Sequence, residues 1–148
     1  MQFFVVGRPI PQGSKKIGRY GGKSSGRPII IDDNGAALSS WRKTVTLATQ
    51  ANRAYEAFDG PVSVELVFNM RCPQRPKHVY PTTRPDVDKL ARSVLDSLTD
   101  AGAWKDDSQV TRLAARKVYA PDGIEGVMIS ISKETEKGTS PIRRNNNG

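Results

Sequence analysis

The chain is poor in the side chains that most metal and nucleophilic sites use. Its only cysteine is Cys72, which excludes a disulfide within the chain and a cysteine-based zinc site. Its only histidine is His78, which argues against a histidine-dependent catalytic triad and against histidine-rich zinc chemistry. An active site in this chain must therefore be built from oxygen ligands.

Long apolar runs are also absent. No run approaches the roughly twenty residues that a membrane-spanning helix needs. Residues 1–6 lack a basic leader and a cleavage site, and their apolar character predicts an interior β-strand rather than a signal peptide. A length of 148 residues suits one domain with a single core. We therefore expect a cytoplasmic, single-domain protein without a membrane partner.

Acidic residues are outnumbered by basic ones, 15 against 23, so the formal net charge is +8. Residues 7–27 hold six basic residues, six glycines and no acidic residue, which predicts a flexible basic loop that lies along a nucleic-acid backbone. A solvated surface loop is the alternative. The candidate nucleic-acid-binding residues of this loop are Lys15, Lys16, Arg19 and Lys23. A second basic stretch, residues 71–84, ends at Arg84 and leads directly into the carboxylates at Asp86 and Asp88.

Those carboxylates flank a predicted helix. Pro85 favours an extended residue before it and a helix start after it, and apolar residues then recur at three- and four-residue steps as far as Leu98. Asp86 and Asp88 stand at the predicted start, where a carboxylate is also a common N-cap. The chain returns through Asp106 and Asp107, which could equally be solvated turn residues.

Gathered carboxylates repel one another unless a proton or a cation lies between them, and hard oxygen ligands suit Mg²⁺ or Mn²⁺. The spacing allows Asp86 and Asp88 to lean toward one point and the returning loop to add Asp107. Such a site, flanked by basic loops, favours chemistry on a phosphodiester.

Three blocks of this region are in register with a known family. They are Asp-Val-Asp-Lys-Leu at 86–90, Leu-Asp-Ser-Leu at 95–98 and Trp-Lys-Asp-Asp-Ser-Gln-Val at 104–110. The stretch resembles the RusA family of Holliday junction resolvases, and residues 9–15 are more weakly similar to it. The resemblance implies an α+β, RusA-like fold and makes Asp86, Asp88 and Asp107 the catalytic metal ligands, with Mg²⁺ as the cofactor and Mn²⁺ as a substitute.

The resemblance also assigns supporting roles and shows two departures. The family's basic residue one turn beyond the second aspartate falls on Arg92, where lysine is usual, and the family's frequent asparagine is Lys89. Either cation could neutralise charge on the phosphoryl group. Asp96 could orient Arg92, or form only a simple ion pair with it. Asp106 is a further ligand or a turn residue.

The function that this resemblance implies is endonucleolytic resolution of four-way (Holliday) DNA junctions by paired symmetric nicks, in DNA recombination and repair. A two-fold substrate favours a homodimer. Two alternatives stay open: a non-catalytic DNA- or RNA-binding module that uses the aspartates only as caps, and a metal-dependent nuclease that acts on other branched DNA.

The remaining pattern predicts a mixed sheet with two packed helices. We expect strands at residues 2–6, 28–31, 62–68 and 109–119, and a final hairpin that turns at 121–123. One helix is expected at 36–54 and another from just after Pro85 to a stop at Ala101-Gly102, because glycine tolerates the left-handed conformation at a helix end. Trp41 falls on an apolar helical stripe and is expected in the core. The predicted domain spans residues 1–132, and residues 133–148 are predicted to be a disordered basic tail.

Overall fold

The computed structural model describes residues 1–13, 16–18, 29–31, 35–53 and 56–135. Three of the predicted nucleic-acid-binding residues, Lys15, Arg19 and Lys23, lie outside these ranges. So do residues 136–148, the greater part of the predicted tail; Lys133, which was assigned to that tail, is the last residue of a strand.

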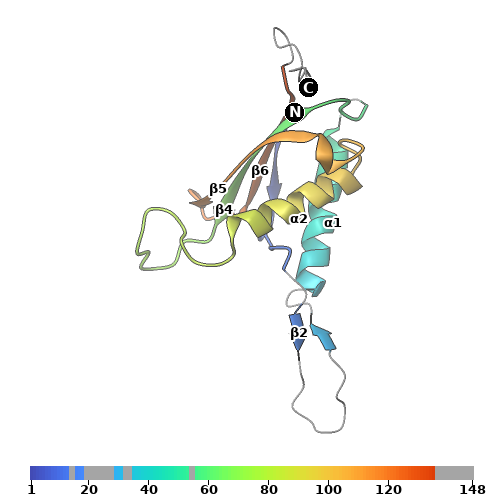
Figure 1. The fold of residues 1–148 in the computed structure, drawn as a ribbon. Coiled ribbons are helices and arrows are strands. Elements are labelled where there is room, and N and C mark those ends of the chain that lie inside the picture. Colours follow the sequence, from blue (N-terminus) through green and yellow to red (C-terminus); the bar gives the residue numbers. More distant parts are fainter. Residues whose placement is uncertain (14–15, 19–28, 32–34, 54–55, 136–148) are drawn as a thin grey trace, which may run out of the picture.

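The centre of the fold is a four-stranded mixed sheet with two helices against it, as the sequence predicted (Figure 1). The strand order is β1-β6-β4-β5, with β4 and β5 parallel and the other neighbours antiparallel. The strands of this sheet are β1 (Gln2–Val6), β4 (Val62–Met70), β5 (Val110–Tyr119) and β6 (Gly126–Lys133).

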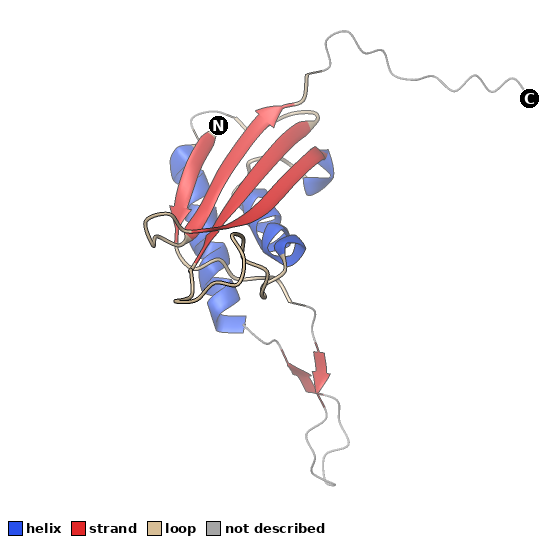
Figure 2. Cartoon of the chain, turned by 90° about the vertical axis from the view of Figure 1, so that its left-hand side faces the viewer, coloured by secondary structure: helices blue, strands red, loops and turns tan. Residues whose placement is uncertain are grey.

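Both helices, α1 (Gly35–Asn52) and α2 (Val87–Asp100), cover the same face of this sheet (Figure 2). Alternate residues of β4 point toward them and are fully buried, because a strand directs every second side chain to one face. The apolar stripe of α2 meets these residues through Leu90, Val94 and Leu98. Trp41 of α1 lies in the core, as expected. Among the described residues, no helix has both the length and the apolar character needed to cross a membrane.

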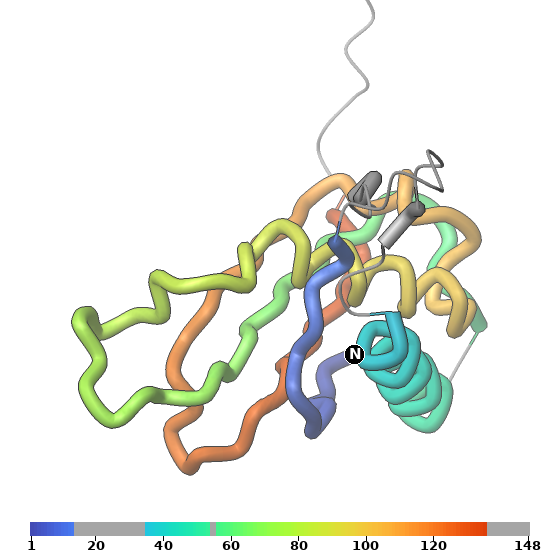
Figure 3. The backbone as a smooth tube through the Cα atoms, turned by 90° about the horizontal axis from the view of Figure 1, so that it is seen from below, coloured from blue at the N-terminus to red at the C-terminus, as the bar shows by residue number. Residues whose placement is uncertain are grey.

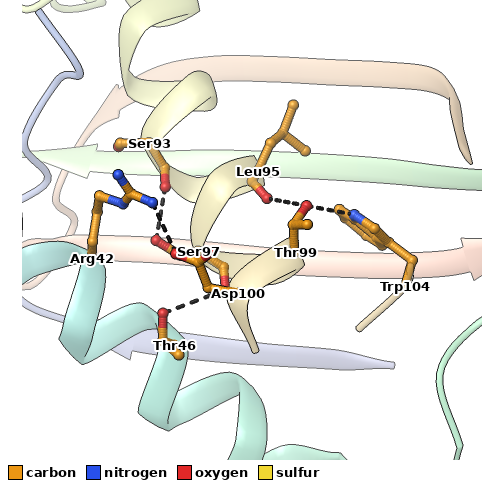
Figure 4. Close-up of polar contacts among 8 residues, drawn as sticks. All are labelled: Arg42, Thr46, Ser93, Leu95, Ser97, Thr99, Asp100 and Trp104. Atoms are coloured by element: carbon orange, nitrogen blue, oxygen red, sulfur yellow. Dashed lines mark hydrogen bonds and ion pairs between the residues drawn. The ribbon is translucent and has the colours of Figure 1, made fainter. Parts of the chain in front are cut away.

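Polar contacts fasten the two helices to each other and close the end of α2 (Figure 4). The Arg42 guanidinium of α1 lies 2.8 Å from the Asp100 carboxylate, and the Thr46 hydroxyl donates to the Ser97 carbonyl at 3.4 Å. After the helix, the Trp104 indole N–H donates to the Thr99 hydroxyl at 2.8 Å. The chain is therefore held tightly where it leaves α2 and returns toward the sheet.

The unit β4–α2–β5 decides where the two ends of α2 lie. Parallel pairing sets Val62 beside Val110 at one end and Met70 beside Tyr119 at the other. Because α2 follows β4, it begins near the last residues of β5 and runs back toward the first. The Lys117 ammonium of β5 confirms this, since it donates to the Pro85 carbonyl at 2.9 Å, directly before α2.

Two predictions about the sheet were wrong. The turn at 121–123 does not close a hairpin, because β6 pairs with β1 and β4 and not with β5. The chain instead passes from one side of β4 to the other. The strand at 2–6 is not interior: β1 is at the edge of the sheet and pairs only with β6 among the described strands. Burial of one of its faces against the helices explains its apolar sequence without a second neighbour.

The first part of the predicted flexible loop, residues 7–13, is fixed to the domain. The Gly7 amide donates to the Glu125 carbonyl at 3.0 Å, and the Gln12 amide donates to the Lys89 carbonyl at 3.1 Å. The Ser93 hydroxyl donates to the Ile10 carbonyl at 2.8 Å. Further along, β2 (Lys16–Gly18) and β3 (Ile29–Ile31) pair with each other as a separate antiparallel ribbon.

Candidate functional site

Asp86 and Asp88 stand together at the first turn of α2, and both are exposed. Asp86 is the N-cap residue by its backbone, with an extended φ of −72° and ψ of 139°, but its side chain makes no capping hydrogen bond. The nearest cation is the Lys89 ammonium, 3.7 Å from a carboxylate oxygen of Asp86. A capping hydrogen bond therefore does not explain why aspartate stands at position 86, and the carboxylate oxygens of Asp86 stay available to a ligand.

A broad groove opens beside Asp86, with a volume of about 710 Å³. Its wall comes from segments far apart in sequence, including the loop of residues 71–85 that extends beside the end of β5 (Figure 3). Two acidic residues line it, Asp86 and Glu125. The cations that line it are Arg8, Arg71, Arg84, Lys89 and Lys117. This excess of positive charge suits the phosphates of a nucleic-acid backbone.

Only two of these five cations, Arg84 and Lys89, were predicted as site residues. Arg8, Arg71 and Lys117 reach the groove through tertiary structure: Arg8 from the segment after β1, and Lys117 from the end of β5. Basic content was visible at Arg8 and Arg71. Nothing local marks Lys117, because its position depends on the parallel pairing of β5 with β4.

Asp106 has a structural role. Its carboxylate accepts a hydrogen bond from the Ser108 amide at 2.9 Å, and the Gln109 side-chain oxygen accepts one from the Asp106 amide at 3.2 Å. This reciprocal capping box starts the 3₁₀ turn η1 (Asp107–Gln109). The bond from Ser108 lowers the pKa of Asp106 below its ordinary value. The spacing Asp-x-x-Gln was the signal for this turn in the sequence.

Asp107 is also exposed, but its surroundings raise its pKa, whereas those of Asp106 lower the pKa of that residue. Desolvation is the main cause that raises the pKa of Asp107, and the hydrogen bond and negative charge of Asp106 and the charge of Asp96 add to it. No hydrogen bond holds the Asp107 carboxylate as an N-cap of η1; that position belongs to Asp106. A carboxylate with a raised pKa and acidic neighbours is ready to accept a cation.

Asp107 is at the far end of the β4–α2–β5 unit from Asp86 and Asp88. The two positions are separated by α2, whose 14 residues span about 21 Å. Asp96, the α2 carboxylate whose charge acts on Asp107, is eight residues beyond Asp88, about 12 Å along the helix axis. Within the described part of a single chain, no three carboxylate, histidine or cysteine side chains gather closely enough to hold a metal ion.

The other predicted residues divide between the groove and the surface. Arg92 is exposed on α2, and no ion pair joins it to Asp96 within the described ranges. Lys89 is therefore the cation in contact with a predicted ligand. Lys16 belongs to the β2–β3 ribbon. The catalytic and binding roles of these residues stay predictions.

Comparison with known proteins covers most of the chain. The family model described as endodeoxyribonuclease RusA matches residues 7–132. The chain is also similar to YqaN of Bacillus subtilis (strain 168), an uncharacterized protein, with 28% identity over 141 residues that cover 87% of this chain and 94% of the relative. The match begins directly after β1 and spans β4, β5 and β6 as far as the next-to-last residue of β6, together with α1, α2, the groove and the three predicted ligands. The chain therefore belongs to the RusA endodeoxyribonuclease family.

Proposed function

We propose that the protein is a Mg²⁺-dependent endonuclease that resolves four-way DNA junctions by paired symmetric nicks, in recombination and repair. The observation that carries this proposal is the position of Asp86, an exposed carboxylate that lines a groove together with five cations, with the exposed Asp88 two residues further along in the first turn of α2. Membership of the RusA family supplies the reaction class. Cations that bind the backbone next to carboxylates that bind a metal are the parts that phosphodiester hydrolysis needs.

The donor set fits a hard divalent cation. Asp86, Asp88 and Asp107 offer only carboxylate oxygens, which Mg²⁺ prefers, and Mn²⁺ would be accepted as a substitute. When bound, the ion would lower the pKa of a water molecule and neutralise charge on the phosphodiester. The free carboxylate of Asp86, with no capping hydrogen bond, supports this assignment.

The chain's own cations would bind and orient the DNA strand. Arg71, Arg84 and Lys117 line the groove and would hold phosphates on either side of the scissile bond. Lys89 lies 3.7 Å from Asp86, which favours it over the exposed Arg92 as the group that faces the reacting phosphate. A homodimer would place two such sites on a two-fold junction.

Two other functions make different predictions. A non-catalytic DNA- or RNA-binding module would need the basic groove but neither Mg²⁺ nor the aspartates. A nuclease for other branched DNA, such as flaps or forks, would need the aspartates but would not prefer four-way junctions.

A synthetic four-way junction and its matched linear duplex, each with and without Mg²⁺, separate these functions. We expect the wild type to nick the junction in a Mg²⁺-dependent way and Asp88→Asn to lose at least about a hundredfold in rate, as removal of one electrostatic group from a catalytic site commonly does. Binding by Asp88→Asn should be unchanged or tighter, because one negative charge near phosphate is lost. Glu56→Gln, an exposed carboxylate outside the groove and α2, is the matched control and should stay active.

Binding without nicking by the wild type in any metal would instead identify a binding module. Equal nicking of junction and duplex, or faster nicking of flaps and forks, would reject junction resolution while keeping the nuclease.

A further inference from the structure

The loop of residues 71–85, between β4 and α2, extends away from the sheet and from both helices (yellow-green in Figures 1 and 3). Every residue from 71 to 80 is exposed. The loop holds four basic residues, four prolines and no acidic residue. Each proline ring fixes one backbone dihedral angle, so the loop has fewer conformations to lose when it binds a partner. The loop is therefore a positively charged projection with a restricted backbone.

Two neighbouring apolar side chains, Val79 and Tyr80, stand on this projection and are called the apolar pair below. Val79 exposes 83% of its surface, the largest fraction of any large apolar residue in the described ranges, and Tyr80 exposes 54%. Neither belongs to the hydrophobic core of the described residues. Contact with water is unfavourable for apolar surface, so a partner that covers the apolar pair would gain free energy.

The Tyr80 ring is held from one side by β5. The Arg116 guanidinium lies over the ring, 5.6 Å from its centroid, and donates to the Tyr80 hydroxyl at 3.4 Å. The next cation of β5, the Lys117 ammonium, donates to the carbonyls of Thr83 and Pro85 at 2.8 and 2.9 Å. The sheet therefore fixes both the ring and the end of the loop, and the exposed part of the ring is open to another flat group.

The same loop forms part of the groove beside Asp86. Its groove-lining residues are Arg71, Pro73, Pro81, Thr83, Arg84 and Pro85. The apolar pair is not among them, so it stands outside the groove on a segment that is continuous with its wall. Phosphates bound by the groove cations would bring the adjoining bases toward the apolar pair. The positive charge of the loop favours nucleic acid over a protein as the partner of this surface.

We propose that the apolar pair stacks on bases exposed at the branch point of a DNA junction, while the groove cations bind the adjoining phosphates. In a continuous duplex each base is covered on both faces by its neighbours, whereas a branch interrupts the stack and leaves base faces free. Aromatic side chains accept any base on such a face, and apolar side chains inserted between base steps are used by proteins that distort DNA.

The inference rests on the proposed function, because it assumes a branched DNA substrate. It adds the group that distinguishes a branch from a duplex. The groove cations cannot make that distinction, because phosphates are present in both.

Affinity for a synthetic four-way junction and for its matched linear duplex tests the proposal. In an Asp88→Asn background, which we expect to bind without cutting, Tyr80→Ala should weaken junction binding about five- to hundredfold, the range that loss of one base–aromatic stack produces. Duplex affinity should change little, because a duplex offers no free base face. Tyr80→Phe should keep the junction affinity, since the ring makes the stack. Leu47→Ala, which truncates a similarly exposed apolar side chain on α1, is the matched control and should bind as the background does.

The salt dependence of the same affinities separates stacking from charge. Tyr80→Ala should leave the slope of log affinity against log salt concentration unchanged, because it removes no phosphate contact. A slope reduced by about 1 or more would show that the substitution displaces cations of the loop, and it would overturn the stacking role.

The fluorescent base 2-aminopurine, whose emission depends on its stacking, gives a direct measurement. Placed next to the branch, it should change its emission when saturated with Tyr80→Phe protein and keep it when saturated with Tyr80→Ala protein. Placed in the middle of an arm, it should respond to neither variant.

Equal junction affinities of Tyr80→Ala and Tyr80→Phe, or equal emission changes at the branch, overturn the stacking and leave the apolar pair as a contact for another protein. If the wild type meanwhile nicks junctions with Mg²⁺, the proposed function stands. A wild type that nicks no junction rejects the proposed function instead, and the emission of the branch base still decides whether Tyr80 contacts it.

Discussion

Two adjacent aspartates, Asp106 and Asp107, show how local contacts distinguish a capping carboxylate from one that makes no capping bond. Asp106 accepts the Ser108 amide and has a lowered pKa, as a capping residue should. Asp107 accepts no such bond and has a raised pKa, because desolvation and acidic neighbours disfavour its charge. The sequence could rank the two only by resemblance, whereas hydrogen bonding gives a physical reason to prefer Asp107 as the ligand.

The capping role of Asp106 predicts that its shape matters more than its charge. Asp106→Ala should lower the melting temperature, because the Ser108 amide loses its acceptor, while Asp106→Asn should stay close to wild type, since asparagine also caps. The folded pKa of Asp106 is lowered, so the stability from its charge is present at neutral pH and is lost as the pH falls through the folded value. Thermal denaturation at pH 7 and at pH 3 measures both effects. Equal melting temperatures of the alanine and asparagine variants would contradict the cap.

Substitution of Asp107 should affect activity rather than stability, the reverse of what is expected for Asp106. Its folded pKa is raised, so its charge disfavours the folded state at neutral pH, and Asp107→Asn should keep or slightly raise the melting temperature while it abolishes nicking. As the pH is lowered, Asp107 should take up a proton at a higher pH than an ordinary aspartate does. The nicking rate should therefore begin to fall at a higher pH than it would with an ordinary aspartate at this position. Asp96→Asn removes one cause of the shift and should move that decline to lower pH.

A pH profile of the nicking rate for the wild type, Asp96→Asn and the control Asp100→Asn checks this displacement. Asp100 is paired with Arg42 and is not among the groups that shift Asp107. A displaced profile in Asp100→Asn, or none in Asp96→Asn, would contradict the proposed coupling.

At the scale of elements, α2 could be predicted because its signals are local. Pro85, the apolar stripe and the glycine after Ala101 mark its start, its buried face and its end within a few residues. Strand order could not be predicted, because it depends on pairing between distant segments: the turn at 121–123 was a good hairpin signal, yet β6 pairs on the far side of β4. Asp107 was expected to join Asp86 and Asp88 in one cluster; the parallel return of β5 instead sets it at the other end.

The end of α2 gives a prediction about stability. Gly102 has a φ of +78°, and a Cβ there would lie 2.6 Å from the Arg53 guanidinium, which donates to the carbonyls of Ala101 and Gly102. Gly102→Ala should therefore destabilise the fold by about 1–2 kcal/mol from the left-handed backbone alone, and displacement of Arg53 adds to this.

Urea unfolding of Gly102→Ala beside Gly13→Ala measures this effect. Gly13 is the matched control, because a Cβ at that position meets no atom within 4 Å. A midpoint for Gly102→Ala equal to that of Gly13→Ala would show that the end of α2 tolerates a side chain.

At the scale of the whole molecule, the described residues bring positive charge together in the groove beside Asp86. The net charge of +8 would favour nucleic acid anywhere on the surface. The groove focuses it, with five cations from four separate parts of the chain beside Asp86. The sequence predicted DNA binding by residues 7–27, which stays a prediction, and it could not show the groove, because the groove forms only in the folded chain.

The salt dependence of DNA affinity can distinguish binding in the groove from binding by cations spread over the surface. In an Asp88→Asn background, which we expect to bind without cutting, Arg71→Ala should weaken junction binding. It should also reduce the slope of log affinity against log salt concentration by about 1, as expected for one lost phosphate contact. Lys43→Ala removes an equally exposed cation from α1, outside the groove, and should change the slope little. The measurement is a fluorescence-anisotropy titration at several salt concentrations. Equal slopes for the two variants would mean that DNA does not use the groove beside Asp86, and the phosphate-binding role of its cations would have to be given up.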